Sequence, residues 1–411
     1  MEISQLLLSF SLLMLIALAL YPLAEKYLLP YPTLLVMAGY IGSEILISQG
    51  MDTGLRWDSF RDLVYYILLP VLIYEAAFLL SGEKLLRNLF PILLLSIPFM
   101  LASTLITAIL IYFGIHHPSG FPLIAAMMTG ALLSATDPST IAPLLNRLHA
   151  SERLVSLLEG ESLFNSVMAI ILVSLILEFV IAGGGSLTFN SSFILFVRMF
   201  TGGLLLGIAV GAIGWGLSLL IRQTVLRGVI SLVTSYSGYL MAEIWLDVSG
   251  LLAVLVAGLI LNGFAQKSGK ESQQFLQQLW EYKAYIAKVL LFILLGVSIR
   301  FSLLTDQWIA ILIGIVAVLV ARAVIVFLGL WLFSHRKKPE AFTTTDKKII
   351  FWGNIKGAAT IALVLSLPDT LPYSTTIQGI AYGVILFSLF VQAPTLRFLL
   401  PPPSTPQRKN P

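Results

Sequence analysis

The chain is a succession of long apolar segments separated by short polar ones. An apolar helix of about 20 residues is long enough to cross the roughly 30 Å hydrocarbon core of a bilayer. Thirteen such segments are found near residues 4–24, 31–49, 62–80, 89–114, 121–145, 153–182, 192–221, 226–245, 248–264, 279–298, 306–333, 346–366 and 374–399. The pattern predicts an all-α polytopic membrane protein with about 13 transmembrane helices, and residues 400–411 form a short tail.

Composition supports this class. Of 411 residues, 58% are hydrophobic and 11% are charged, whereas soluble domains carry about 25% charged residues. The absence of cysteine excludes disulfides and thiolate metal sites. Most lysines and arginines lie in short loops between apolar segments, so the net charge of +4 does not indicate a nucleic acid partner. No transit peptide is recognised, and we expect the cell membrane, plasma or inner.

The distribution of basic residues sets the expected orientation. With the N-terminus outside, seventeen lysines and arginines fall in cytoplasmic loops and the tail, against three in the opposite loops. Because basic residues concentrate on the cytoplasmic side, we expect the N-terminus outside and the C-terminus in the cytoplasm. Arg198, Lys283 and Lys288 lie near span ends, where they can extend toward the interface. Arg322 and Lys356 lie near span centres and require partners.

Two spans carry signals for an interrupted helix. In the fifth span Asp137 precedes Pro138, which lacks an N–H group and favours a break. In the twelfth span Gly353 and Gly357 flank Lys356. The two spans are seven helices apart and therefore cross the membrane in opposite directions. Paired interrupted segments in inverted repeats are typical of transporter binding sites near the bilayer midplane.

The sixth span adds a polar stripe to this predicted site. Glu161 and Asn165 are four residues apart and share one helix face, while Ser162 and Ser166 share the neighbouring face. An alkali cation takes hard oxygen ligands such as carboxylate, hydroxyl, amide and carbonyl oxygens. If a proton competes with the cation for Asp137, the result is exchange. The candidate cation and proton ligands are Asp137, Thr136, Ser162, Ser166 and Asn165.

Several motifs, taken in order, resemble one known family. They are Leu69-Pro70 through Glu75-Ala76-Ala77, Thr136-Asp137-Pro138, residues 159–165, Ser249 to Val254, Ala321-Arg322 and Gly353 to Ala359. With them the chain resembles the monovalent cation/proton antiporter family, which includes prokaryotic sodium/proton antiporters and the animal sodium/hydrogen exchangers.

The resemblance implies both an architecture and residue roles. It implies two crossed, partly unwound helices in a core domain, a separate dimerisation domain, a homodimer and elevator-like alternating access. We place the core helices around 62–182 and 279–366 of one membrane unit, 1–411. Asp137 resembles the family's Asp-Pro carboxylate, and Glu161 resembles a structural glutamate paired with Arg322. Thr136 and Ser162 resemble cation ligands.

Two positions depart from the family pattern. The family has aspartate, its main cation and proton carrier, where this chain has Ser166, and arginine where this chain has Lys356. These changes predict weaker or differently coupled cation binding. Since lysine can lose its proton and arginine stays charged, Lys356 could itself release a proton. A Lys356→Arg variant with the wild-type pH profile would count against that hypothesis.

Three classes of function therefore remain open. The first is an antiporter that exchanges a monovalent cation for protons, with sodium favoured over potassium or lithium. The second is an antiporter scaffold without transport, through natural or introduced change at Ser166, or a sensor. The third, an intramembrane hydrolase, is disfavoured because no catalytic pair is found and no histidine lies in a span. We expect no enzyme, no cofactor and no resident metal. Glu75, at mid-span, is either structural or part of an access path, and Glu243 is expected to be solvated at a span end.

Overall fold

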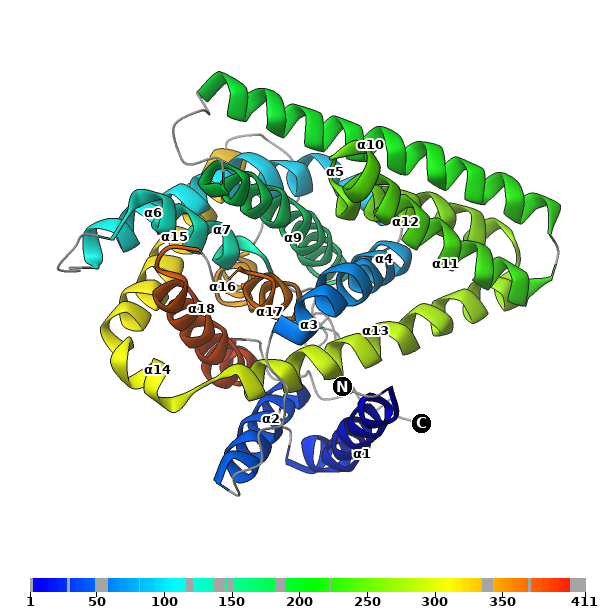
Figure 1. The fold of residues 1–411 in the computed structure, drawn as a ribbon. Helices are drawn as coiled ribbons and strands as arrows, with labels where there is room; N and C mark the ends of the chain where they lie inside the picture. Colours follow the sequence, from blue (N-terminus) through cyan, green and yellow to red (C-terminus); the bar gives the residue numbers. More distant parts are fainter. Residues whose placement is uncertain are drawn as a thin grey trace, which may run out of the picture.

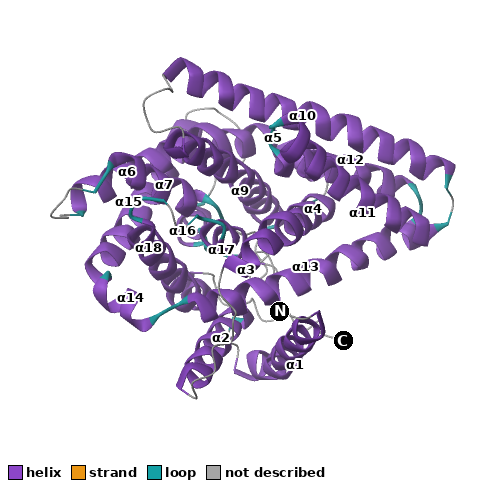
Figure 2. Cartoon of the chain, in the orientation of Figure 1, coloured by secondary structure: helices purple, strands orange, loops and turns teal. Residues whose placement is uncertain are grey.

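A computed structural model describes residues 3–27, 30–48, 58–80, 82–115, 121–136, 145, 151–181, 189–221, 223–334, 343–368 and 371–399. Within these ranges the chain is helical and contains no β-strand, as the all-α prediction requires (Figure 2). Asp137 and Pro138, on which the sequence prediction relied, lie outside the described residues.

The helices follow one another with short connections (Figure 1). The first half comprises α1 (Ile3–Tyr27), α2 (Tyr31–Ser48), α3 (Asp58–Leu63), η1 (Val64–Leu68), α4 (Leu69–Leu79), α5 (Gly82–Leu94), η2 (Leu95–Phe99), α6 (Met100–Gly114), α7 (Leu123–Ser134) and α9 (Glu152–Ile181). The second half comprises α10 (Phe189–Leu220), α11 (Thr224–Leu240), η3 (Met241–Leu246), α12 (Gly250–Lys267), α13 (Lys270–Ser298), α14 (Phe301–Asp306), α15 (Trp308–Ser334), α16 (Thr344–Trp352), α17 (Ala358–Leu365), α18 (Ser374–Phe387), η4 (Ser388–Gln392), α19 (Ala393–Thr395) and η5 (Leu396–Leu399).

Eight helices of the described chain are long and apolar enough to cross a membrane. They include α9, α10, α12 and most of α15, and the other four join an α-helix to a π-helical turn, as in residues 61–79. The exact number of 13 spans stays a prediction. Figure 1 shows α10 along one edge beside α11 and α12, and α13 along the opposite side, close to α2 and α4.

Three of the four π-helical turns in the described chain lie at or beside a proline. Pro70 follows η1, Pro98 lies inside η2, and Pro394 follows η4. Proline has no N–H group to donate and its ring clashes with the carbonyl one turn earlier. A π-helical turn inserts one residue into the turn and so accommodates the ring without ending the helix. Each of these spans therefore continues past its proline.

Two glycines allow α2 and α13 to cross in close contact. A Cβ atom at Gly39 would lie 2.3 Å from the Ile293 carbonyl oxygen, and one at Gly296 would lie 2.2 Å from the Val36 carbonyl oxygen. Both distances are far shorter than van der Waals contact, so any side chain here would push the helices apart. The crossing fixes the position of α13 along α2. Lys288 of α13 then lies beside Glu75 of α4.

The short helix α17 lies at the centre of the fold. All eight of its residues are buried, and it contacts α4, α7, α9, α13 and α18. A helix that is apolar on every side is stable only when protein or lipid surrounds it. The start of α17, directly after Gly357, is therefore enclosed by elements from both halves of the chain, and the candidate site lies there.

Candidate ion-binding site

The first interruption follows α7. The helix ends at Ser134, and Ala135 is extended, with φ −60° and ψ 141°. The Ala135 carbonyl accepts a 3.0 Å hydrogen bond from Thr360 Oγ1, and the Thr136 carbonyl accepts one of 2.6 Å from Ser166 Oγ. Backbone at membrane depth outside a helix must find such partners within the protein. The hydroxyl groups of α17 and α9 supply them.

The second interruption separates α16 from α17. The chain leaves helical geometry after Trp352 and resumes it at Ala358, so the break predicted between Gly353 and Gly357 is present. Lys356 lies inside it with 1% of its surface exposed. Its backbone N–H donates to Ser388 Oγ at 2.7 Å, and its Nζ donates to Asn354 Oδ1 at 3.3 Å. Polar side chains thus hold the backbone and the ammonium of this segment.

Arg322 joins the polar stripe of α9 to the end of α16. Its Nη1 donates to Glu161 Oε1 and its Nη2 donates to Glu161 Oε2 at 3.3 Å. Its Nε and Nη2 also donate to the Ile350 carbonyl at 3.2 and 3.0 Å. Carbonyls at a helix C-terminus lack intrahelical donors and attract a cation. The guanidinium therefore supports the second interruption as well as neutralising the Glu161 carboxylate.

All four polar residues of the α9 stripe are buried: Glu161, Ser162, Asn165 and Ser166. Asn165 Nδ2 lies 3.5 Å from Glu161 Oε1 on the same helix, and the described residues show no bond from Asn165 to another helix. Ser162 Oγ and Asn165 Oδ1 have no hydrogen-bond partner within the described ranges. A buried oxygen without a partner is costly, and both atoms are of the type that binds an alkali cation.

The structure corrects two expectations about charged residues. Lys288 does not extend to an interface: its Nζ lies 3.0 Å from Glu75 Oε1. Glu243 is not simply solvated, because it accepts hydrogen bonds from the Gly250 N–H at 2.9 Å and from Tyr65 Oη at 3.1 Å. Glu243 therefore caps the start of α12, whereas Glu75 belongs to the centre of the molecule.

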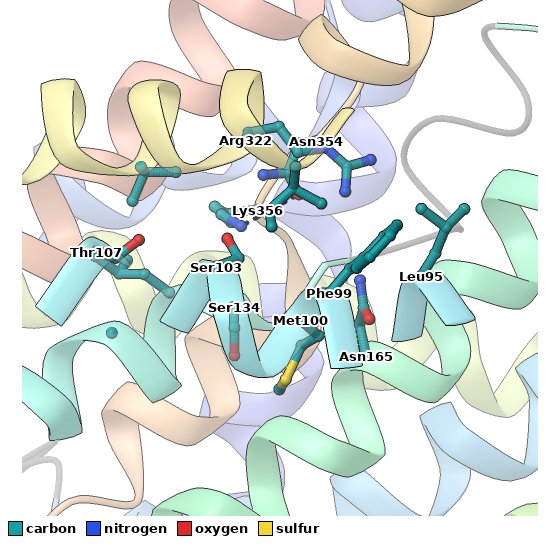
Figure 3. A pocket seen from close by; sticks show the side chains of 14 residues that line it. Leu95, Phe99, Met100, Ser103, Thr107, Ser134, Asn165, Arg322, Asn354 and Lys356 are labelled. Atoms are coloured by element: carbon teal, nitrogen blue, oxygen red, sulfur yellow. Dashed lines mark hydrogen bonds between the residues drawn. The ribbon is translucent and has the colours of Figure 1, made fainter. Parts of the chain in front are cut away.

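Three small cavities surround the two interruptions. The Lys356 cavity, about 20 Å³, is bordered by Lys356, Asn354, Arg322, Asn165, Ser103 and Ser134, which gather around one space in Figure 3. The Glu75 cavity, about 30 Å³, is bordered by Glu75, Lys288, Thr136, Ser166, Ala358 and Ala359. The Glu161 cavity, about 10 Å³, is bordered by Glu161, Arg322, Ser162, Thr136, Gly353 and Asn354. Volumes of this size hold a water molecule or a small ion.

Thr136 borders two of the three cavities and so occupies the centre of the site. The cavities bring the predicted residues Ser162 and Ser166 to Thr136, but from different sides. Glu75 is the residue whose place at the site the sequence left open. Its position in the middle of a span was the available signal, since carboxylates at that depth are costly and usually functional.

The long apolar helices and the apolar exterior define a polytopic integral membrane protein with interrupted helices and enclosed charges at its centre. A sequence model of the family described as "Sodium/hydrogen exchanger, transmembrane" matches residues 12–401. The chain belongs to this family.

Similar sequences agree with that assignment, and a solved structure shares the fold. The Na(+)/H(+) antiporter ApNhaP of Aphanothece halophytica is 32% identical, over 90% of this chain and 69% of its own length. The low-affinity Na(+)/H(+) antiporter NhaS1 of a Synechocystis strain is 35% identical, over 82% of this chain and 64% of its own length. The structure of the sodium proton antiporter MjNhaP1 from Methanocaldococcus jannaschii shares the fold, with a TM-score of 0.79 at 22% identity, over 96% of this chain and all of that one.

Proposed function

We propose that this protein is a secondary antiporter that exchanges a monovalent cation, sodium in preference to potassium or lithium, for protons. Family membership supports exchange as the activity, and the names of the relatives support sodium as the cation. Alternating access by an elevator-like movement, a homodimer, a cell-membrane location with the C-terminus inside, and the division into core and dimerisation domains are parts of the same proposal.

One observation supports the site most directly. The Glu75 carboxylate shares a cavity with Thr136 and Ser166, two ligands predicted from the sequence. A dehydrated cation needs several oxygens and at least one negative charge to replace its hydration shell. Glu75 supplies a carboxylate, Ser166 a hydroxyl, and Thr136 a hydroxyl together with its carbonyl. Asp137, which directly follows Thr136 in the chain, is proposed as the second carboxylate.

Ser166 has two roles in this proposal. Its hydroxyl is within donating distance of the carbonyls of Thr136 and Ser162, at 2.6 and 3.0 Å. A hydroxyl has one proton but two acceptor lone pairs, so while it donates to one carbonyl its oxygen can still face a cation. Ser166 thus contributes a neutral oxygen where the family pattern places an aspartate.

Protons take the place of the cation by competing for carboxylate oxygen. A carboxylate that binds a proton loses the charge that held the cation, and the two occupants exclude each other. With Glu161 bound to Arg322, the carboxylates left for this competition are Glu75 and Asp137. If the site faces each side of the membrane in turn, it carries the cation in one direction and the proton in the other, which is coupled exchange.

The test is sodium-driven proton flux in proteoliposomes. Wild-type protein should release protons when sodium is added, and both Asp137→Asn and Glu75→Gln should lose this flux while remaining folded. Glu178→Gln is the matched control, because Glu178 is an exposed carboxylate on α9. Retention of full flux in either site variant would contradict the proposed site.

The second candidate, a scaffold without exchange, is favoured by Ser166 alone. Ser166 Oγ donates a hydrogen bond to the Thr136 carbonyl. The site is therefore stable without the aspartate of the family pattern. This candidate predicts a wild type with no sodium-driven flux and a Ser166→Asp variant that gains it. The proposed antiporter instead predicts flux in the wild type and a lower KM for sodium in Ser166→Asp.

A further inference from the structure

The Glu75 cavity has two walls of different origin. Glu75 and Lys288 enter it from α4 and α13, while Thr136, Ser166 and Ala358 border it from the first interruption, α9 and α17. Of the described residues that border this cavity, only Glu75 and Lys288 are ionisable. Among the described residues, one wall therefore carries a charge pair and the other carries neutral oxygens.

The lysine is placed so that it can leave the carboxylate. Its side chain is 21% exposed, against 10% for Glu75, and the contact is 3.0 Å. A lysine ammonium is a compact charge on a flexible four-carbon stem, without the fixed fork of an arginine. Lys288 can therefore move away from Glu75 without unfolding α13.

Charge makes the lysine and a transported cation alternatives. Two positive charges cannot both lie against one carboxylate in a small cavity, because their repulsion is strong at low dielectric. The first turn of α17, which starts at Ala358 beside this cavity, adds the positive end of a helix dipole. A cation that binds Glu75 must therefore displace Lys288.

We propose that Lys288 is a built-in competitor at the cation site, an ammonium that neutralises Glu75 until a monovalent cation displaces it. This inference rests on the proposed function, in which Glu75 binds the cation. Lys288 then sets the affinity: it keeps cation binding weak enough for release, and it leaves Glu75 neutralised when no cation is bound. The residue determines affinity through Glu75 and does not itself bind the cation.

The test compares Lys288→Gln with Lys288→Arg in proteoliposomes, using sodium chloride against choline chloride. Removal of the charge should lower the KM for sodium up to about fivefold, since the cation no longer has to displace the ammonium from a partly solvated ion pair. The maximal rate should not increase, because tighter binding slows release. Lys288→Arg, which keeps the charge, should keep the wild-type KM.

The matched control is Lys283→Gln. Lys283 lies on the same helix, with its Nζ 5.0 Å from the centre of the Trp280 ring, and it does not border the Glu75 cavity. Its KM for sodium should not change. Sodium-dependent thermal stabilisation of the purified protein gives a second readout that needs no turnover, and Lys288→Gln should be stabilised at lower sodium concentration than the wild type.

The outcomes separate the two proposals. An unchanged or higher KM in Lys288→Gln, together with an inactive Glu75→Gln, would overturn the role of Lys288 and leave the cation site intact. Full exchange in Glu75→Gln would overturn both. A wild type without exchange that gains sodium binding in Lys288→Gln would support the lysine as competitor and contradict exchange as the native activity.

Discussion

Two acid–base pairs lie near the same broken helices, and they are built differently. Arg322 contacts both carboxylate oxygens of Glu161 and also the Ile350 carbonyl. Lys288 contacts Glu75 through one nitrogen. The side chains of the first pair are 8% and 3% exposed, whereas those of the second are 21% and 10% exposed. The first pair is enclosed and multiply bonded, and the second is partly accessible.

The difference separates support from exchange. A planar guanidinium with several bonds to one carboxylate and a backbone carbonyl is fixed in place. An ammonium with one contact beside a cavity can be replaced by another cation. We therefore assign Glu161 and Arg322 to the framework that holds the interruptions, and Glu75 and Lys288 to the part of the site that changes partners.

The largest effect should come from breaking the framework pair. Glu161→Gln leaves a buried guanidinium without its counter-charge, which typically costs about 3–5 kcal/mol. We expect a marked fall in thermal stability of the purified protein in detergent, at all sodium concentrations. Glu178→Gln, an exposed carboxylate on the same helix, serves as control. Wild-type stability in Glu161→Gln would mean that this pair is not part of the framework.

The next effect should distinguish two serines one helical turn apart. Ser166→Ala removes the donor to the Thr136 carbonyl, and an unsatisfied buried carbonyl costs about 1–3 kcal/mol. Ser162 Oγ has no hydrogen-bond partner within the described ranges, so Ser162→Ala should leave stability unchanged and raise the KM for sodium. Thermal unfolding and flux assays measure the two variants together. Equal loss of stability in Ser166→Ala and Ser162→Ala would contradict the distinction between a structural hydrogen-bond donor and a cation ligand.

A smaller effect on stability is expected at the pair of Glu75 and Lys288, which is partly accessible. Glu75→Gln should cost about 1 kcal/mol or less, because the pair is partly solvated and exposed ion pairs contribute little. The comparison with Glu161→Gln in one unfolding assay is the sharpest form of the contrast between the pairs. A larger loss at Glu75 than at Glu161 would reverse the assignment of framework and exchange.

The smallest expected change concerns pH. Lysine can release its proton whereas arginine stays charged, so Lys356→Arg should alter the pH profile of exchange while leaving stability close to wild type. Sodium-driven flux measured across a pH series decides this. If the two profiles coincide, Lys356 acts only as a fixed counter-charge to the broken helix.

The sequence was sufficient for the features that depend on local chemistry. Apolar length predicted helices, and glycine at positions 353 and 357 predicted the break between α16 and α17. The contact of Glu161 with Arg322 was expected from resemblance to the family and is present. The number of 13 spans, the roles of the ligands, and the positions of Asp137 and Pro138 stay predictions.

The partner of Lys288 could not be read from the sequence, because Glu75 is 213 positions away. In a membrane protein, both the lipid-facing and the buried sides of a helix are apolar, so periodicity says little about which side a residue occupies. We expected Lys288 to reach the interface, although it lies in the middle of the predicted span 279–298. The packing of α13 against α4 instead directs its side chain to Glu75. The sequence likewise does not tell whether Asn165 bonds within its own helix or to another, and its contact lies within α9.

In the proposed mechanism the Glu75 carboxylate exchanges Lys288 for a transported cation. The double variant Glu75→Gln/Lys288→Gln is the most direct test of that exchange. It removes both charges and leaves neither unpaired, so the protein should fold and insert as the wild type does. We predict that its sodium-driven proton flux falls to the level of protein-free liposomes. A double variant that exchanges sodium for protons at the wild-type rate would contradict the role of the Glu75 cavity in transport.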